Sequence, residues 1–549
     1  MTSTQGLPGG GEAAVADVGA TRPVRRPGVP AHRRSGRGRS RAVYACALLA
    51  AFGALLWEWL AVLRTIRGQG INLIGDEPHY LAEAVSIGRF HTINLVPAYN
   101  YAVQHHIIYP WAGKPGPGLA RAIGQGLAIH NQFLPFHAVG MSALLAGPML
   151  IGTDTAVVTL ITLMAALTVS LVHLTGELSG VRSPGRVAIA GLFLAPAFAL
   201  AATQVYPDLL TGLVMANAVM IIALVETRKR CPGVHLAALT VLLMVLPWLD
   251  QKNIFFPVPL LVAFLFAYWR AGLPTRRVVA VAVLTLVSLA SLLFVNVYEF
   301  GHLLGGPQAI ELVGMATLTR FVALLVDRRQ GLVVQMPVVL LGLAGLWSVR
   351  RRVPVAAAIA VLVVLAMLWG NATQPANFGG YSFIGRFQWP TLPVLVAFAG
   401  LYLLELWRVR RLAVGILSAA IAAAYVVQMV PILRNEHVFY NGTAGYSGWW
   451  GGLDPSPILG NLYLPVFHNG RNLWGLACVV LVCATACYCL TRLLERPARW
   501  RVPGLAVAVA AIVVTLVMTL SSSSVEPAGA RNGHGVPVAA SRPVVPVRT

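Results

Sequence analysis

Charged residues are scarce in this chain of 549 residues: Asp, Glu, Lys and Arg together make up 11%, against 57% hydrophobic residues. A soluble globular domain carries about 25% charged residues. The mean hydropathy is +0.72, and apolar runs long enough to cross a bilayer recur along the chain. The composition therefore excludes an ordinary soluble domain and predicts an all-α polytopic membrane protein.

Lysine is also rare, and the chain lacks cysteine patterns and nucleotide-binding loops. Lys114, Lys229 and Lys252 are the only lysines, whereas Arg, Ala, Val and Gly abound, which is typical of a GC-rich bacterial genome. Six cysteines form no metal or disulfide pattern, and no Gly-rich nucleotide loop occurs. The net charge of +22 comes from short clusters between apolar segments, so it does not predict binding of nucleic acid.

The chain divides into three parts by composition. The high content of Gly, Pro and Arg in residues 1–41 predicts a disordered basic cytoplasmic tail. Residues 42–520 predict the transmembrane domain, and 521–549 a disordered extracytoplasmic tail. About thirteen spanning helices are expected: 43–63, 154–178, 187–203, 208–225, 234–249, 254–272, 278–298, 332–349, 353–370, 389–405, 412–433, 473–494 and 503–520.

The basic clusters predict which loops face the cytoplasm. With the amino terminus inside, every cluster of the membrane domain falls on the cytoplasmic side, as the positive-inside rule requires. These clusters are Arg182–Arg186, Arg228–Arg230, Arg276-Arg277, Arg350–Arg352, Arg408–Arg411 and Arg492–Arg501. A span at 134–152 would invert all of them, so we expect a juxtamembrane or re-entrant helix there. The first outer loop then runs over 64–153 of a multi-pass protein of the bacterial plasma membrane.

An acidic pair opens this first outer loop. Asp76 and Glu77 lie in Gly75-Asp-Glu-Pro78, followed by His79 and Tyr80. Carboxylates at a membrane surface are costly, and they suit a general base or a ligand of a divalent cation. The alternative is structural, with Asp76 as the N-cap of a helix and Pro78 in its first turn.

Other polar residues collect on the same side of the membrane. Tyr206 and Asp208 open the next outer turn, which a plain helix start would also explain. Lys114 lies on a Gly/Pro turn, where it suits a phosphate or simply solvent. Arg328 and Arg386 face outward against the positive-inside trend, so each binds an anion, such as a lipid phosphate, or snorkels to the interface. Asp250 and Lys252 fall outside too, without an assigned role.

Together these residues resemble the GT-C superfamily of integral-membrane glycosyltransferases, near its protein-mannosyltransferase and aminoarabinose-transferase branch. The chain is similar to a bacterial group that opens with Gly-Asp-Glu-Pro-His-Tyr-Leu, here Gly75–Leu81. The resemblance covers about 43–405, and the last three helices and both tails lie outside it. Its later landmarks are Gln204-Val-Tyr-Pro-Asp208, Leu246-Pro-Trp-Leu249, Asp327-Arg-Arg-Gln-Gly331 leading to Pro337, and Gly385-Arg-Phe387.

The resemblance implies roles for several residues. Asp76 would be the catalytic base, with Glu77 beside it, and Asp208 would help to shape the site, although Glu is commoner at that place. Lys114-Pro115 resembles a first-loop Lys-Pro motif, for which His137 is a competing match. Arg328 and Arg386 would bind the donor phosphate, as candidates beside Lys114.

The resemblance also implies a reaction. A polyprenyl-phosphate sugar would be the donor, with inversion at the anomeric carbon, and the acceptor hydroxyl would belong to a cell-envelope glycan, a glycolipid or a protein. No cofactor is firmly expected, and a divalent Mg²⁺ or Mn²⁺ held by Glu77 and Asp208 is left open. Two alternatives remain: a flippase of lipid-linked sugars, or a non-catalytic lipid-binding membrane scaffold. The helices hold few charges near their centres, which favours an enzyme over a transport path.

Overall fold

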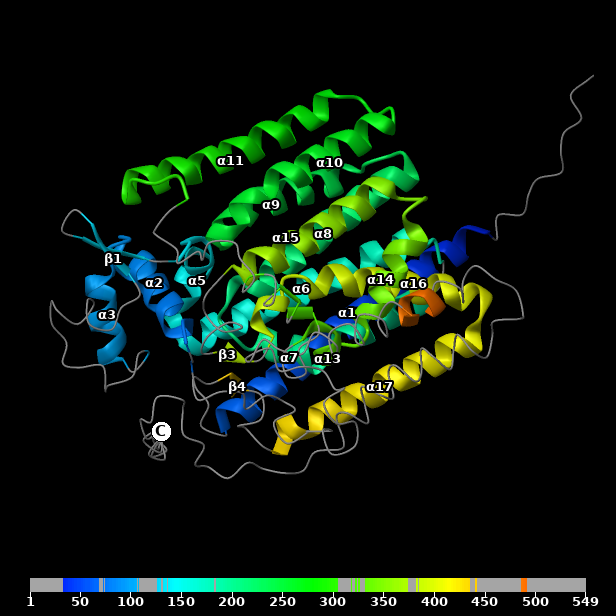
Figure 1. The fold of residues 1–549 in the computed structure, drawn as a ribbon, viewed down its shortest axis with the longest axis horizontal. Coiled ribbons are helices and arrows are strands. Elements are labelled where there is room, and N and C mark those ends of the chain that lie inside the picture. Colours follow the sequence, from blue (N-terminus) through cyan, green and yellow to red (C-terminus); the bar gives the residue numbers. More distant parts are fainter. Residues whose placement is uncertain are drawn as a thin grey trace, which may run out of the picture. The chain divides into compact units, whose positions relative to one another are not determined.

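The computed structural model describes residues 33–68, 73, 75–105, 107, 126–129, 132–135, 137–181, 184–304, 317, 321–322, 324–325, 331–373, 382–383, 385–434, 440–441 and 485–490. The chain forms two separate units, Met1–Ala45 and Cys46–Thr549. In the larger unit, the described residues form helices and four short strands (Figure 1).

The elements follow one another along the chain in this order. The first part contains α1 (Arg33–Gly68), α2 (Glu77–Phe90), α3 (Leu95–Gln104), β1 (Gly126–Ile129), β2 (Gln132–Pro135), α5 (Gly140–Ile151), α6 (Thr153–Ser179), η2 (Pro184–Phe193), α7 (Pro196–Ala202), α8 (Pro207–Arg228), α9 (Gly233–Leu249) and η3 (Gln251–Phe255). The second part contains α10 (Pro257–Arg270), α11 (Arg276–Phe300), α13 (Leu332–Gln335), α14 (Val339–Val349), α15 (Pro354–Ala372), β3 (Ser382–Phe383), η5 (Arg386–Gln388), α16 (Leu392–Val409), α17 (Arg411–Arg434) and β4 (Tyr440–Asn441). Strands β1 and β2 pair antiparallel, as do β3 and β4.

Helix α8 forms the centre of the bundle. It packs against α6, α9, α10, α15 and α16, and the apolar window of its span is completely buried. A helix surrounded on all sides needs apolar residues all round, which explains why α8 lacks a polar face. Its interior Asn217 donates a hydrogen bond to the Leu167 carbonyl of α6 at 3.1 Å. The start of α8, which carries Asp208, is therefore held firmly by its neighbours.

Close backbone contacts join α14 to α16. A Cβ at Gly342 or Gly345 would overlap the carbonyl groups of Leu395 and Phe398. Small residues at such positions let membrane helices approach closely, which is a common source of stability inside bilayers. This contact fixes α16, and with it the turn at Gly385 and η5 that precedes α16.

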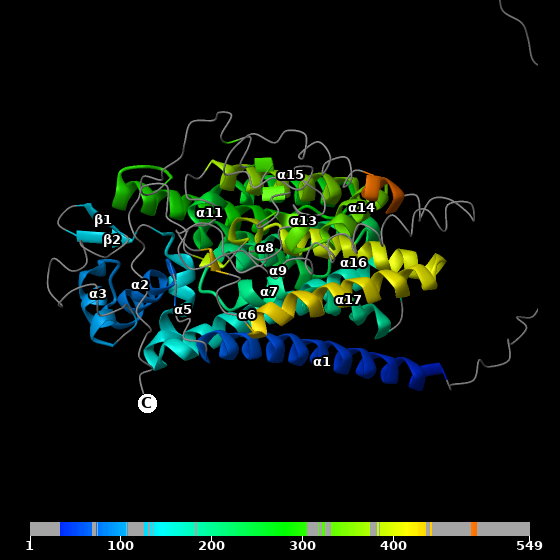
Figure 2. The same ribbon diagram turned by 60° about the horizontal axis from the view of Figure 1, so that its bottom comes forward.

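A smaller group of elements caps one end of the bundle. Helices α2, α3 and α5 and the β1–β2 hairpin cluster beyond the ends of α6 and α9 (Figures 1 and 2). Helix α2 packs on α5, where Gly88 brings its backbone against the Ala146 carbonyl. With 12 residues, α5 is about 18 Å long, too short for a hydrocarbon core of about 30 Å. The structure thus places a short helix, as expected, within residues 134–152.

Eight helices in the described part of the chain are long and apolar enough to cross a membrane. The protein is therefore a multi-pass membrane protein, whereas the expected count of thirteen spans stays a prediction. Two expected spans are interrupted: 187–203 is a helix pair bent by 67°, and 332–349 is divided into α13 and α14. Pro196 and Pro337 lie at these breaks, where a missing N–H ends a helix. The segments 473–494, apart from 485–490, and 503–520 lie outside the described residues.

The first span begins earlier than its apolar run. Helix α1 starts at Arg33, so residues 33–41 of the segment expected to be disordered are helical. Arginine is a good helix former, and a helix stabilised downstream extends through such residues. The remainder of the basic tail and the segment 521–549 lie outside the described residues.

Candidate active site

Arg386 joins the two aspartates that the sequence analysis singled out. Its Nη1 atom lies 2.8 Å from Asp76 Oδ2, and its Nε atom lies 3.1 Å from Asp208 Oδ2. The guanidinium carbon also lies 3.7 Å from the centre of the Tyr206 ring, in a cation–π contact. The Arg386 side chain is only 13% exposed. Asp76 and Asp208, which precede Arg386 by 310 and 178 positions in the sequence, thus meet at its guanidinium.

Lys252 forms the second cationic centre. Its Nζ atom lies 2.8 Å from Asp208 Oδ1, 3.1 Å from Asp250 Oδ2 and 3.3 Å from Asn371 Oδ1. Both oxygens of the fully buried Asp208 carboxylate therefore accept hydrogen bonds from a cation. A buried charge persists only when it is paired and hydrogen-bonded. Asp208 acts as the buried anion that holds Lys252 and Arg386 together.

Local sequence signals position these side chains. Pro207 occupies the first turn of α8, so Asp208 sits at the positive end of a helix dipole. Asp250 ends α9 and caps η3 by accepting the Lys252 backbone N–H at 3.2 Å. Gly385 has φ +85°, a left-handed conformation that favours glycine, and it turns the chain into η5. Three turns between helices thus direct their charges to one place.

The capping alternative for Asp76 does not account for its side chain. Asp76 occupies the N-cap position of α2, but its carboxylate makes no capping hydrogen bond, and it contacts Arg386 instead. The Asp76 side chain is 23% exposed, in contrast to the buried Asp208. Glu77 faces the protein interior, where its Oε1 atom accepts the Val205 N–H at 2.6 Å. The two adjacent carboxylates therefore have different surroundings, and Asp76 is the one within reach of a substrate.

Tyr206 supports the loop that carries Asp76. Its hydroxyl oxygen accepts the Asp76 backbone N–H at 3.0 Å, and its ring meets Tyr80 edge-on at 6.2 Å. Burial raises the pKa of both phenols well above the ordinary value, so both hydroxyls keep their protons. His79 lies beside Tyr99, with 2.7 Å between Nδ1 and the hydroxyl. Burial, together with nearby His137, lowers the pKa of His79 to about 4, which keeps its imidazole neutral at physiological pH.

A polar cluster behind Tyr80 ties α2 to α5. Glu83 Oε1 lies 3.2 Å from His137 Nδ1, and Glu83 Oε2 lies 2.9 Å from Ser142 Oγ. The His137 ring stacks on Tyr80 at 4.4 Å between centres. Burial raises the pKa of Glu83; for His137, the Glu83 carboxylate outweighs burial and raises the pKa. His137 thus belongs to the support of the site through Glu83, a residue that the sequence analysis did not single out.

Glu77 and Asp208, for which a metal role was left open, make other contacts. Glu77 accepts a backbone hydrogen bond, and both Asp208 oxygens contact cationic side chains. In the part of the chain that the structure describes, no group of three or more His, Cys, Asp or Glu side chains is arranged to hold a metal ion. These residues therefore do not fit a shared metal site as they stand.

The structure brings together most of the residues that the sequence analysis named. Asp76, Tyr80, His137, Tyr206, Asp208 and Arg386 lie in one connected set of contacts. Glu77 and His79 are near Asp76 in sequence, and their side chains contact Val205 and Tyr99. Lys114 and Arg328 lie outside the described residues. Sequence reasoning missed the roles of Lys252, Asp250 and Asn371. The usable signal was Lys252 itself, a rare lysine two residues after Asp250 at the end of a helix.

Comparisons with known proteins give a distant structural likeness. No family model matches the chain, and no curated protein matches it. Among solved structures, the chain is similar to ArnT from Cupriavidus metallidurans bound to undecaprenyl phosphate, at 15% identity and a TM-score of 0.41, covering 86% of this chain and 76% of that one. The apo state of the same ArnT gives 15% identity and a TM-score of 0.42, covering 88% and 77%.

Proposed function

We propose that the protein is a membrane glycosyltransferase that moves a sugar from a polyprenyl-phosphate donor to an acceptor hydroxyl at the extracytoplasmic face, with inversion. The observation that carries this proposal is the Asp76–Arg386–Asp208–Lys252 cluster. It combines one partly exposed carboxylate with two cations and lies where helix ends meet short outer elements. The Gly75–Leu81 motif and its GT-C resemblance support the same reading.

The two aspartates have separate tasks in this mechanism. Asp208 is buried and neutralises Lys252 and Arg386, so it positions the cations. Asp76 is partly exposed beside Arg386, so its carboxylate is the one that an acceptor hydroxyl can approach. As the acceptor oxygen attacks the anomeric carbon, Asp76 takes the hydroxyl proton as general base.

The cations serve the leaving group. The bond from the anomeric carbon to the phosphate oxygen breaks, and negative charge develops on the polyprenyl phosphate. Arg386 offers a planar set of N–H donors for phosphate, and Lys252 offers a compact positive charge. Attack on the face opposite the phosphate inverts the anomeric centre, so a second carboxylate acting as nucleophile is not needed.

The proposal is tested with purified protein in lipid nanodiscs. A panel of radiolabelled polyprenyl-phosphate sugars is offered with candidate acceptors, with and without Mg²⁺ or Mn²⁺, and transfer is measured. Turnover of one donor identifies the sugar. Comparing the reactions with and without Mg²⁺ or Mn²⁺ decides whether transfer needs a divalent metal. Binding of no donor, together with no transfer to any acceptor, would contradict the proposal.

Arg386→Lys provides a matched variant for the phosphate role. The substitution keeps the positive charge but loses the bidentate N–H geometry. We expect weaker donor binding, with a raised KM.

The two alternative functions predict other results. Transport of a lipid-linked sugar across sealed vesicles without sugar transfer would support a flippase. Lipid binding without transport or transfer would support a non-catalytic membrane scaffold.

A further inference from the structure

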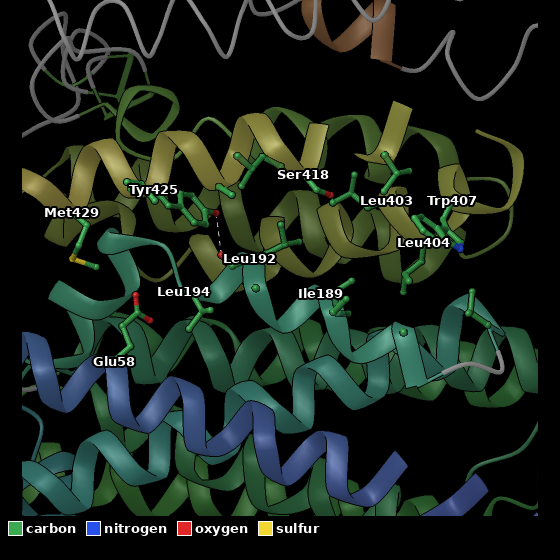
Figure 3. A pocket seen from close by; sticks show the side chains of 18 residues that line it. Glu58, Ile189, Leu192, Leu194, Leu403, Leu404, Trp407, Ser418, Tyr425 and Met429 are labelled. Carbon is green, nitrogen blue, oxygen red and sulfur yellow. Dashed lines mark hydrogen bonds between the residues drawn. The ribbon is translucent and has the colours of Figure 1, made fainter. Parts of the chain in front are cut away.

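A long groove runs along one face of α17. It has a volume of about 660 Å³, within the range of about 300–1,000 Å³ that is usual for ligand pockets. Helix α17 forms one wall, η2 and α16 form the others, and Glu58 of α1 closes one end (Figure 3). None of the candidate active-site residues lines this groove.

The dimensions of the groove suit a hydrocarbon chain. The α17 residues that line it share one helix face over four turns: Val414, Ser418, Ile421, Ala422, Tyr425, Val426 and Met429. From Val414 to Met429 the helix rises about 22 Å, more than one leaflet of a hydrocarbon core about 30 Å thick. Gly185, Ala188 and Gly191 on the facing wall leave the space open. Helices α16 and α17 are both candidate spans, so two walls of the groove belong to helices that are long and apolar enough to cross a membrane.

The groove has a basic end. Arg186 follows the lining residue Gly185, and Arg408 follows the lining Trp407. Arg410 and Arg411 lie one turn before Val414, with the Arg411 guanidinium 5.9 Å from the Trp407 ring centre. Arg408 donates a hydrogen bond to the Ser179 carbonyl, and the Arg186 stem packs against Gly176, so both side chains lie on the end of α6 that leads to the lining residue Val181. Four arginines thus belong to the segments that form this end of the groove. The nearby carboxylate of Glu405 is paired with Arg352 at 3.0 Å.

The opposite end is acidic. Figure 3 shows Glu58 beside Leu194 and Met429, at the end away from Trp407. The Glu58 Oε2 atom is buried and has no hydrogen-bond partner among the described residues. The neighbouring Tyr425 hydroxyl donates to the Leu192 carbonyl at 3.0 Å. No Lys or Arg lines the groove at this end, so an anionic head group finds basic side chains only at the other end.

We propose that this groove binds one acyl chain of an anionic phospholipid, with the lipid phosphate among the arginines 186, 408, 410 and 411 and the chain directed towards Glu58. Arginines bind phosphate by charge-assisted hydrogen bonds, and basic pockets between spanning helices recognise anionic head groups. The arginines at one end of the groove fix the direction of the lipid. This lipid site is separate from the donor site at Arg386 and does not depend on glycosyl transfer.

Two neighbouring alanines give a matched test. Ala422 and Ala423 are both exposed on α17, but only Ala422 lines the groove. Delipidated full-length protein is titrated with phosphatidylglycerol, phosphatidylcholine or diacylglycerol, and bound lipid is counted by native mass spectrometry. We expect phosphatidylglycerol to bind most tightly, Ala422→Phe to abolish this preference, and Ala423→Phe to keep it. Equal binding of the three lipids, or equal effects of the two variants, would overturn the proposal.

Two further measurements do not depend on the folding of Ala422→Phe. Arg411→Gln should weaken phosphatidylglycerol about fivefold, because a basic residue near anionic lipid contributes about 1 kcal/mol. In the unaltered protein, phosphatidylglycerol with a photoreactive chain end should label peptides that contain Leu192–Leu194 or Ala422–Met429. Labelling confined to other peptides, or unchanged affinity in Arg411→Gln, would argue against the lipid orientation proposed here.

Discussion

Asp76 and Asp208 both contact Arg386, but they differ in exposure. This difference assigns the chemical role to Asp76 and the supporting role to Asp208. The Asp208 carboxylate is buried between two cations, whereas the Asp76 side chain is 23% exposed. Removing one member of a buried charge cluster leaves its partners as uncompensated buried charges, and this typically costs about 3–5 kcal/mol. The two aspartates should therefore respond differently to the same substitution.

Asp208→Asn is expected to destabilise the fold by about 3 kcal/mol, because Lys252 and Arg386 lose their shared counter-charge. Asp76→Asn is the matched control and should cost about 1 kcal/mol or less, since its pair is partly exposed. Thermal unfolding in detergent checks both variants. Equal losses for the two variants would contradict the division between a supporting and a substrate-facing aspartate.

His79 gives the site a predicted pH dependence. Its pKa is about 4 in the folded protein and 6.5 as an ordinary histidine, so between these values the unfolded chain binds more protons. Stability therefore rises with pH through this window, and the His79 contribution is fully present above about pH 6.5. Lowering the pH from 7 to 4 should remove up to about 3 kcal/mol. His79→Gln should flatten this part of a plot of unfolding temperature against pH, and an unchanged slope would show that His79 does not titrate in this way.

At the scale of elements, glycine contacts decide how closely helices approach. An added Cβ at Gly345 would overlap the Phe398 carbonyl of α16, whereas Gly415 on α17 has nothing within 4 Å. Gly345→Ala should destabilise the protein by about 1–3 kcal/mol through overpacking. Gly415→Ala should be neutral or stabilising by up to about 1 kcal/mol through helix propensity. Thermal unfolding of both variants measures the difference, and equal effects would contradict the close α14–α16 packing.

The boundaries of the helices show which features local sequence patterns can predict and which they cannot. The short helix within 134–152 was predicted because a full span would have inverted every later basic cluster. The bend between η2 and α7 was not predicted, because hydropathy measures apolar length and not direction. Similarly, the run at 332–349 gives one continuous hydropathy signal, although the chain turns at Pro337 between α13 and α14.

At the scale of the whole molecule, the candidate site depends on contacts that no local pattern contains. The basic clusters predicted that Asp76, Asp208 and Arg386 lie on one side of the membrane, and the structure brings both aspartates to contact distance of Arg386. Lys252 reads as an ordinary interfacial lysine until α8, η3 and α15 bring Asp208 and Asn371 to it. Pairings between residues 44 and 119 positions apart follow from packing, so the sequence alone could not assign them.

The predicted topology can be checked with two exposed arginines. In a cysteine-free chain, Arg89→Cys lies on α2, which is expected to face outward, and Arg230→Cys lies in an expected cytoplasmic loop; both side chains are exposed. A membrane-impermeant maleimide added to intact cells should label the cysteine at position 89, and the one at position 230 only after the membrane is opened. The reverse pattern would place the candidate active site on the cytoplasmic side.

The most direct test of the central claim compares sugar transfer by the unaltered protein and Asp76→Asn, with the donor found in the nanodisc panel. General-base catalysis contributes about 10²–10⁴-fold. We predict that Asp76→Asn loses transfer by at least about 100-fold while it still binds the polyprenyl-phosphate donor, because Arg386 and Lys252 remain. Full transfer activity in Asp76→Asn would contradict the assignment of Asp76 as the base.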